Sequence, residues 1–192
     1  VLSNRVLGSL TRMFNFAAER GIIEDTPCSR IRKVKETPRD RVLTNAEIKL
    51  LWECLDIDNK KIDIFRVVKL ALKMILVTGQ RPGEVSQMRF DEIENGFWVI
   101  PPEKMKNGQG NRVYLTPLAL EIIEQARVIS GDDGYIFTSS HKKDSPVLRS
   151  ALGRAVVRHW KEMGFTKPWT PHDLRRTLRT KMAEIGIQDV IA

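Results

Sequence analysis

The sequence has 192 residues, which suffices for one large domain or for one domain and part of a second. Hydrophobic residues make up 42% of it, as in ordinary globular proteins, and the formal net charge of +8 suits a polyanionic partner, nucleic acid before an acidic membrane surface. Within these residues no apolar run is long enough to cross a bilayer, and Cys28 and Cys54 have neither metal-ligand nor disulfide spacing, so neither a membrane span nor a disulfide framework is expected in this part of the chain. We expect a reduced, cytoplasmic setting, and we expect Val1 and Ala192 to be cuts through a longer chain.

The first predicted element is an amphipathic helix over residues 3–20, followed by Gly21 and a turn at Thr26–Pro27. Its apolar residues recur at helical spacing, namely Val6, Leu10, Met13, Phe14 and Ala17. The stretch from Arg32 to Arg41 is charged and nearly devoid of apolar residues, which is typical of a linker. Such a linker can lie along a phosphate backbone or serve only as a solvated tether, and both interpretations stay open.

Two helices are predicted next. Thr44 followed by Glu47 has the form of a capping box, so the first of them begins there. The second runs over residues 61–77 and ends at the Gly79–Gly83 break, where Pro82 suits the first turn of a further short helix. Their apolar faces comprise Ile48, Leu51, Trp52 and Leu55 in the first helix, and Phe65, Val68, Leu72 and Ile75 in the second.

The pattern then changes from helix to strand. Residues 97–100 and 111–115 are strand-like and flank a turn at residues 106–110, which predicts a hairpin. Helical patterns resume at residues 117–129 and 147–163, and Thr170–Pro171 caps a last helix that extends to Ile185. We therefore predict an α+β fold that is mostly helical, with a small antiparallel sheet.

Two distant segments carry residues that suit a phosphate. His172 and Arg175 share one face of the first turn of the last helix, where free N–H groups and the helix dipole already favour an anion. Arg81 lies in a Gly- and Pro-rich turn, and Glu84 can brace its guanidinium. Each segment alone also fits a basic helix start or a surface arginine, and the pairing of the two favours an anion site.

Together these segments resemble the catalytic domain of the tyrosine recombinases, in particular the integrases of phages and mobile elements. The resemblance rests on residues 78–85 for the first arginine motif, Lys106 in the hairpin, and residues 172–177 for the His-x-x-Arg box. It implies the DNA breaking-rejoining catalytic fold over residues 43–192, without the C-terminal tyrosine segment. It also implies that residues 1–33 are the last helices of a core-binding domain and that residues 34–42 form a basic linker.

The resemblance further implies a mechanism without metal, cofactor or ATP. A tyrosine attacks a DNA phosphodiester, and the 3′-phosphotyrosyl link preserves the bond energy for resealing. Arg81 and Arg175 would hold the nonbridging oxygens, and His172 would either help with proton transfer or donate to the phosphate. Glu84 would orient Arg81, and Lys106 would be the general acid, with Lys104 as a rival. The residues expected to contact DNA are Arg39, Arg41, Lys104, Arg176 and Arg179. The implied partner is double-stranded DNA at attachment sites, bound by a homo-oligomer that is a tetramer in the recombination complex, with no membrane involved.

The sequence departs from the family pattern in lacking the further His or Trp and the nucleophilic tyrosine after the His-x-x-Arg box. Tyr114 lies in a predicted strand and Tyr135 precedes an apolar pair, so both are expected to be structural. His141 lies in a polar loop and His159 beside Trp160, so neither histidine is a good substitute. We therefore expect this chain to bind DNA weakly and not to form the covalent link. A type IB topoisomerase and a non-cutting DNA-binding module remain the alternative functions.

Overall fold

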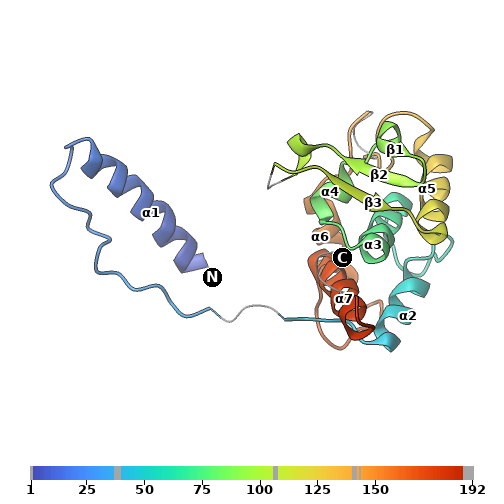
Figure 1. The fold of residues 1–192 in the computed structure, drawn as a ribbon. Helices are drawn as coiled ribbons and strands as arrows, with labels where there is room; N and C mark the ends of the chain where they lie inside the picture. Colours follow the sequence, from blue (N-terminus) through green and yellow to red (C-terminus); the bar gives the residue numbers. More distant parts are fainter. Residues whose placement is uncertain (1, 37–39, 106–107, 140–141, 143, 188–192) are drawn as a thin grey trace. The chain divides into compact units, whose positions relative to one another are not determined.

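The structure is a computed structural model that describes residues 2–36, 40–105, 108–139, 142 and 144–187. The chain forms two compact units, Val1–Asp40 and Arg41–Ala192 (Figure 1). Among the described residues, no helix is long and apolar enough to cross a membrane.

The N-terminal unit consists of helix α1, Leu2–Glu19, and the segment that follows it. The predicted helix over residues 3–20 is thus confirmed to within one residue at each end. Gly21 follows with a φ of 68°, a left-handed conformation that glycine adopts without steric cost. Asn4 then holds the returning chain, because its amide donates to the Val34 carbonyl at 2.7 Å and accepts from the Val34 N–H at 2.9 Å.

The second unit opens with α2, Asn45–Cys54, which begins at the predicted capping box. The Glu47 N–H donates to Thr44 Oγ1 at 3.2 Å, and the Thr44 N–H donates to the Glu47 carboxylate at 2.9 Å. The Arg41 guanidinium also binds that carboxylate and donates to the Val42 carbonyl at 2.8 Å. These contacts fix the point at which the chain enters the second unit.

Glu47 gives the unit a pH-dependent contribution to stability. The hydrogen bonds from Arg41 and Thr44 lower the pKa of the Glu47 carboxyl below its ordinary 4.5. A carboxyl with a lowered folded pKa stabilises the fold above its unfolded pKa, and this contribution is lost as the pH falls through the folded value. Glu47→Gln should therefore cost about 1 kcal/mol at pH 7 and progressively less below pH 4.5. Urea unfolding of both proteins across that range checks this, and a cost that stays constant with pH would contradict it.

Helix α3, Arg66–Thr78, is the centre of the unit, and every residue from Val67 to Leu76 is buried. The predicted start at Lys61 was wrong, and so was the placement of Phe65 in the core, because Phe65 is 62% exposed and precedes the helix. The loop before α3 is held by Lys69 of that helix. Its buried ammonium donates to the carbonyls of Asp56 and Asn59 at 3.1 and 2.6 Å.

A three-stranded antiparallel sheet lies beside these helices, in the order β1, Ile93–Glu94, β2, Phe97–Ile100, and β3, Asn111–Tyr114. The register pairs Phe97 with Tyr114 and Ile100 with Asn111, which confirms the predicted hairpin. The short β1 was not predicted. Trp98 and Ile100 face the core at 1% exposure, so the β2 side chains alternate between core and surface.

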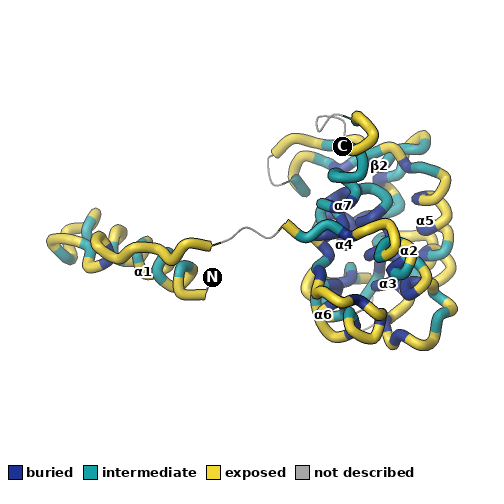
Figure 2. The backbone as a smooth tube through the Cα atoms, turned by 90° about the horizontal axis from the view of Figure 1, so that it is seen from below, coloured by how far each residue is buried: buried dark blue, intermediate teal, exposed yellow. Residues whose placement is uncertain are grey.

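The remaining helices complete the unit: α4, Pro82–Ser86; α5, Pro117–Ser130; α6, Arg149–His159; and α7, Pro171–Glu184. The predicted helix over residues 147–163 is shorter at both ends, because Val147 donates its N–H to the Phe137 carbonyl and the chain turns after His159. Helix α3 packs against α4, α5, α6 and α7, and the buried positions gather around it (Figure 2). The fold is α+β and mostly helical, as predicted.

Candidate functional site

The turn that carries Arg81 begins where α3 ends. Gly79 caps α3 with a φ of 62°, and a Cβ built on it would lie 2.9 Å from Leu178 Cδ2 of α7. Pro82 starts α4 immediately afterwards, as predicted, because the first turn of a helix needs no proline N–H. Gln80, buried between them, accepts a hydrogen bond from Asn111 of β3 at 3.2 Å. The turn is therefore held by both α7 and the sheet.

Glu84 fixes the orientation of Arg81. Its carboxylate accepts the Arg81 backbone N–H at 2.9 Å and the Arg81 Nη1 at 2.6 Å. The Glu84 side chain is 6% exposed and that of Arg81 is 40% exposed. A buried carboxylate thus anchors one edge of a guanidinium that still reaches the surface, which is the geometry expected of a preorganised cation.

The first turn of α7 is held by Asp173. This carboxylate accepts the Thr170 N–H and the Thr170 hydroxyl, each at 2.8 Å, and is 1% exposed. Thr177, one turn later, accepts the Leu43 N–H at 3.0 Å and donates to the Asp173 carbonyl at 2.7 Å. His172 lies exposed on this turn, so the helix start is fixed while the imidazole stays accessible.

Arg175 joins the two segments. Its Nη1 donates to the carbonyl of Gly79, which lies 96 positions earlier in the sequence. Burial lowers the pKa of the Arg175 guanidinium, and the nearby charges of Arg81 and Arg179 lower it further, although Glu84 opposes them. Mutual repulsion of these cations indicates that they share one region, and it is a cost that a bound anion would relieve.

A cavity of about 340 Å³ lies at this junction. It is lined by Arg81, Pro82, Gly83, Glu84, Gln87, Trp98, Ile100, Lys104, Arg149 and His172. Arg81 and His172, predicted from two distant motifs, thus face the same cavity. The positive side chains in its wall suit a phosphate group rather than a neutral ligand.

Lys104 enters the cavity wall from the segment before the hairpin turn. Its ammonium pairs with the Glu92 carboxylate, which is 9% exposed and also accepts the Trp98 indole N–H at 3.0 Å and the Arg89 N–H at 3.1 Å. A second Lys104 contact, to the Gln87 carbonyl, measures 3.4 Å. Lys104 is therefore held as part of the structure before any ligand arrives.

Removing the Lys104 ammonium should leave the Glu92 charge buried without its cation. We expect Lys104→Met to lower the free energy of unfolding by about 1–3 kcal/mol. The double variant Lys104→Met with Glu92→Gln should lose less free energy of unfolding than Lys104→Met alone. The introduced amide still accepts from Trp98 and Arg89 and carries no charge. Urea unfolding of the parent, Lys104→Met, Glu92→Gln and the double variant gives the coupling free energy between the two side chains. Additive losses would mean that the pair contributes nothing to stability.

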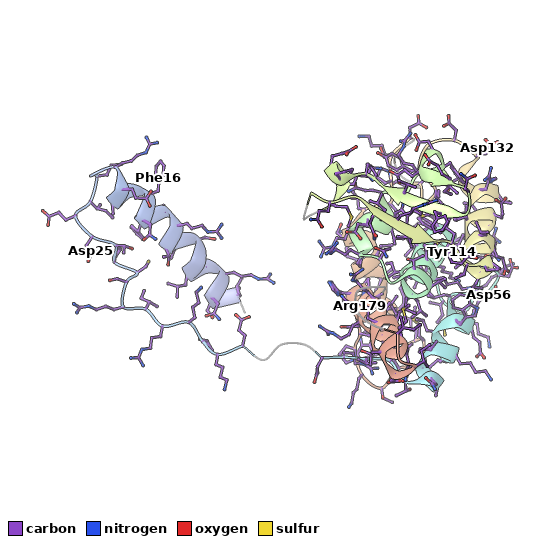
Figure 3. All side chains as sticks on the ribbon, viewed as in Figure 1. Phe16, Asp25, Asp56, Tyr114, Asp132 and Arg179 are labelled. Atoms are coloured by element: carbon purple, nitrogen blue, oxygen red, sulfur yellow. The ribbon has the colours of Figure 1, made fainter. Side chains whose placement is uncertain are left out.

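The predicted DNA-contacting residues have mixed surroundings. Arg41 forms an ion pair with Glu47, and the Arg41 side chain is 15% exposed. This contact gives Arg41 a structural role at the entry to the unit. Arg176 pairs with Asp173 at 3.4 Å, and Arg179 lies on α7 (Figure 3). Lys106, the predicted general acid, and Arg39 lie outside the described residues, as does His141. The assignments of these residues stay predictions.

Neither tyrosine lies in the cavity wall. Tyr114 stacks edge-on against Phe97 on the exposed face of the sheet, with ring centroids 5.5 Å apart (Figure 3). The Arg89 guanidinium lies over the Tyr135 ring, with Arg89 Cζ 5.0 Å from the ring centroid. Both tyrosines thus make structural contacts, in line with the sequence prediction. His159 is buried and binds Glu162 at 2.7 Å.

Two residues in and next to the cavity wall were not predicted from the sequence. Arg149, the first residue of α6, lines the cavity although no motif includes it. Glu92 holds Lys104, and its spacing of three residues from Arg89 was the one signal that it could cap a short turn. Neither residue could be related to the site before the packing of α6 and the pairing of Glu92 with Lys104 were known.

Comparison with known proteins identifies the family. The phage integrase family matches residues 41–191, almost the whole second unit. The chain therefore belongs to the phage integrase family.

Curated relatives and solved structures agree with this. The chain is 26% identical over 190 residues to prophage integrase IntA of Escherichia coli, covering 97% of this chain and 45% of IntA. It is 27% identical over 187 residues to tyrosine recombinase XerA of Pyrococcus furiosus, covering 96% and 61%. A lambda integrase tetramer bound to a Holliday junction has the same fold, with a TM-score of 0.73 and 22% identity over 96% of this chain and 55% of that one. The tyrosine-recombinase catalytic fold is thus confirmed, and the chain spans about half the length of the relatives it matches.

Proposed function

We propose that this chain supplies the catalytic domain of a tyrosine site-specific recombinase that cuts and rejoins double-stranded DNA. The observation that supports this most strongly is the bond from Arg175 to the Gly79 carbonyl, because it brings the His-x-x-Arg helix onto the Arg81 turn. Arg81 and His172 then line one cavity, and Arg175, which is not part of its wall, lies near enough to Arg81 for the two charges to interact.

In the proposed reaction a tyrosine hydroxyl attacks the phosphorus, and its proton passes to His172 or to water as the new bond forms. The bond from phosphorus to the 5′-oxygen breaks, and Lys106 protonates that oxygen, leaving a free 5′-hydroxyl and a 3′-phosphotyrosyl ester. Arg81 and Arg175 stabilise the charge that develops on the nonbridging oxygens, and His172 donates to the same group. A 5′-hydroxyl of another strand reverses the step, which rejoins DNA without an external energy source.

The positioning of these groups precedes the reaction. Glu84 holds Arg81, and Asp173 holds the turn that carries His172. Fixed donors that need no reorganisation are what makes electrostatic stabilisation of a transition state effective. The remaining assignments follow from the family: attachment-site DNA as substrate, a homo-oligomer that is a tetramer in the recombination complex, and action in the cytoplasm of a bacterial or phage-infected cell.

Incubation with a nicked duplex, followed by a denaturing gel, tests the proposal. A chain continued to the length of its relatives should give an adduct that blocks a 3′-exonuclease and leaves a 5′-hydroxyl that a kinase can label. The present 192-residue chain should bind the same DNA without an adduct, because Tyr114 and Tyr135 lie outside the cavity wall. Binding without an adduct in the longer chain would indicate a non-cutting module, and resealing without exchange between duplexes would indicate a topoisomerase.

A further inference from the structure

Arg149 differs from the other cations of the site in its partners. Arg81 is bound to Glu84, Lys104 to Glu92, and Arg175 donates to the Gly79 carbonyl. Arg149 is exposed, and among the residues that the structure describes it has no hydrogen bond, ion pair or ring contact. It is thus an uncompensated guanidinium in the cavity wall, where Arg81 and Lys104 each pair with a carboxylate.

The position of Arg149 is nevertheless defined. It is the first residue of α6, and a Cβ built on Gly83 would lie 3.7 Å from the Arg149 Cδ, in ordinary van der Waals contact. The aliphatic part of the side chain therefore covers the first turn of α4, two residues beyond Arg81. This packing keeps the Arg149 side chain at the cavity and leaves the N–H donors of its guanidinium available for a ligand.

Arg149 also joins two cavities. A second cavity, of about 710 Å³, runs along α6, and it shares Pro82, Arg149 and His172 with the first. Its wall otherwise consists of Ser150, Gly153, Arg154, Val157, Arg158, Thr170 and Pro171. Arg154 and Arg158 are exposed, and no carboxylate lines this second cavity. A phosphate backbone that occupies the first cavity can continue into the second past Arg149.

We propose that Arg149 is a DNA-contacting residue that binds a backbone phosphate beside the one held by Arg81. It is a positioning residue, because it would fix the DNA strand over the site rather than act on the reacting atoms. The proposal rests on the proposed function, since it requires double-stranded DNA in the cavity. It assigns this role to a residue outside every motif that identifies the family in this sequence.

The test measures the affinity of the 192-residue chain for a 20-base-pair fluorescent duplex at several salt concentrations. Each lost phosphate contact lowers the slope of log affinity against log salt by about 0.9. Arg149→Ala should lower the slope by that amount and weaken binding about three- to tenfold, while Arg149→Lys should retain most of the slope. Lys49→Ala, an exposed cation on α2 that lines neither cavity, is the matched control and should leave the slope unchanged.

An unchanged slope in Arg149→Ala would overturn the inference, provided that Arg81→Ala lowers it. Equal losses in Arg149→Ala and Lys49→Ala would also overturn it, because they would reflect net charge alone. Failure of the unaltered chain to bind the duplex would instead overturn the proposed function. Because Arg149 is exposed and unpaired, its variants should unfold at the same temperature as the parent, which separates lost contact from lost fold.

Discussion

Replacing Arg175 by alanine is expected to lower the rate of DNA cleavage about 10²–10³-fold, as for the loss of one donor to a developing oxyanion. The variant loses the guanidinium and also the bond to Gly79 that holds α7 on the Arg81 turn. Arg175→Lys should recover only part of the rate, because an ammonium cannot both bind the Gly79 carbonyl and present a planar fork to phosphate. Single-turnover cleavage of a nicked duplex, by a chain continued to the length of its relatives, measures the effect.

Arg176→Ala is the matched control for this prediction. Arg176 follows Arg175 on the same helix but pairs with Asp173 at 3.4 Å, and its side chain is 38% exposed. Its removal should weaken DNA binding and leave the cleavage of bound DNA nearly unchanged. Similar losses of rate in both variants would argue that the first turn of α7 acts through its charge and not through Arg175 in particular.

Gly79→Val should destabilise the second unit by about 2–4 kcal/mol. A β-branched residue is strained at the φ of 62° that Gly79 adopts, and its side chain would meet Leu178, whose Cδ2 lies 2.9 Å from a Cβ built there. The loss should appear as a fall in melting temperature of about 5–15 °C, given about 2–4 °C per kcal/mol in a unit of this size. The same change should weaken DNA binding, because the Gly79 carbonyl holds Arg175.

Gly153→Val provides the comparison. Gly153 lies within α6, and a Cβ built on it meets no atom within 4 Å. A helical glycine is less favourable than most other residues, so this change should alter stability by less than about 0.5 kcal/mol. If Gly79→Val were as mild, then neither the left-handed turn nor the contact with Leu178 would constrain the joint between α3 and α7.

The local elements were predictable because their signals are local. The capping box at Thr44 and Glu47 and the proline at the start of α4 depend on residues a few positions apart, and the hairpin was predicted from two strand-like stretches that flank one turn. The start of α3 was wrong for the opposite reason. The Lys69 ammonium donates hydrogen bonds to the carbonyls of Asp56 and Asn59, and this tertiary contact keeps the loop before α3 from joining the helix.

The candidate site divides in the same way. Arg81 and His172 were found from motifs, and the structure brings both to one cavity. Arg149 and Glu92 belong to no motif. Arg149 reaches the cavity because α6 packs against α4, and Glu92 is related to the site only through its ion pair with Lys104. Arg41 belongs to a charged stretch that was predicted to be a linker, but its guanidinium binds Glu47 inside the unit, and its contact with DNA stays a prediction.

Arg81 and Arg175 are proposed to hold the same phosphate, and a double-mutant cycle tests this most directly. The affinity of the 192-residue chain for the 20-base-pair duplex would be measured for the parent, Arg81→Ala, Arg175→Ala and the double variant. When two residues bind the same group, the free-energy losses caused by replacing each of them do not add. We predict that the double variant binds within about threefold of the weaker single variant. If the two losses instead multiply, the arginines contact separate parts of the DNA, and the single phosphate site would be contradicted.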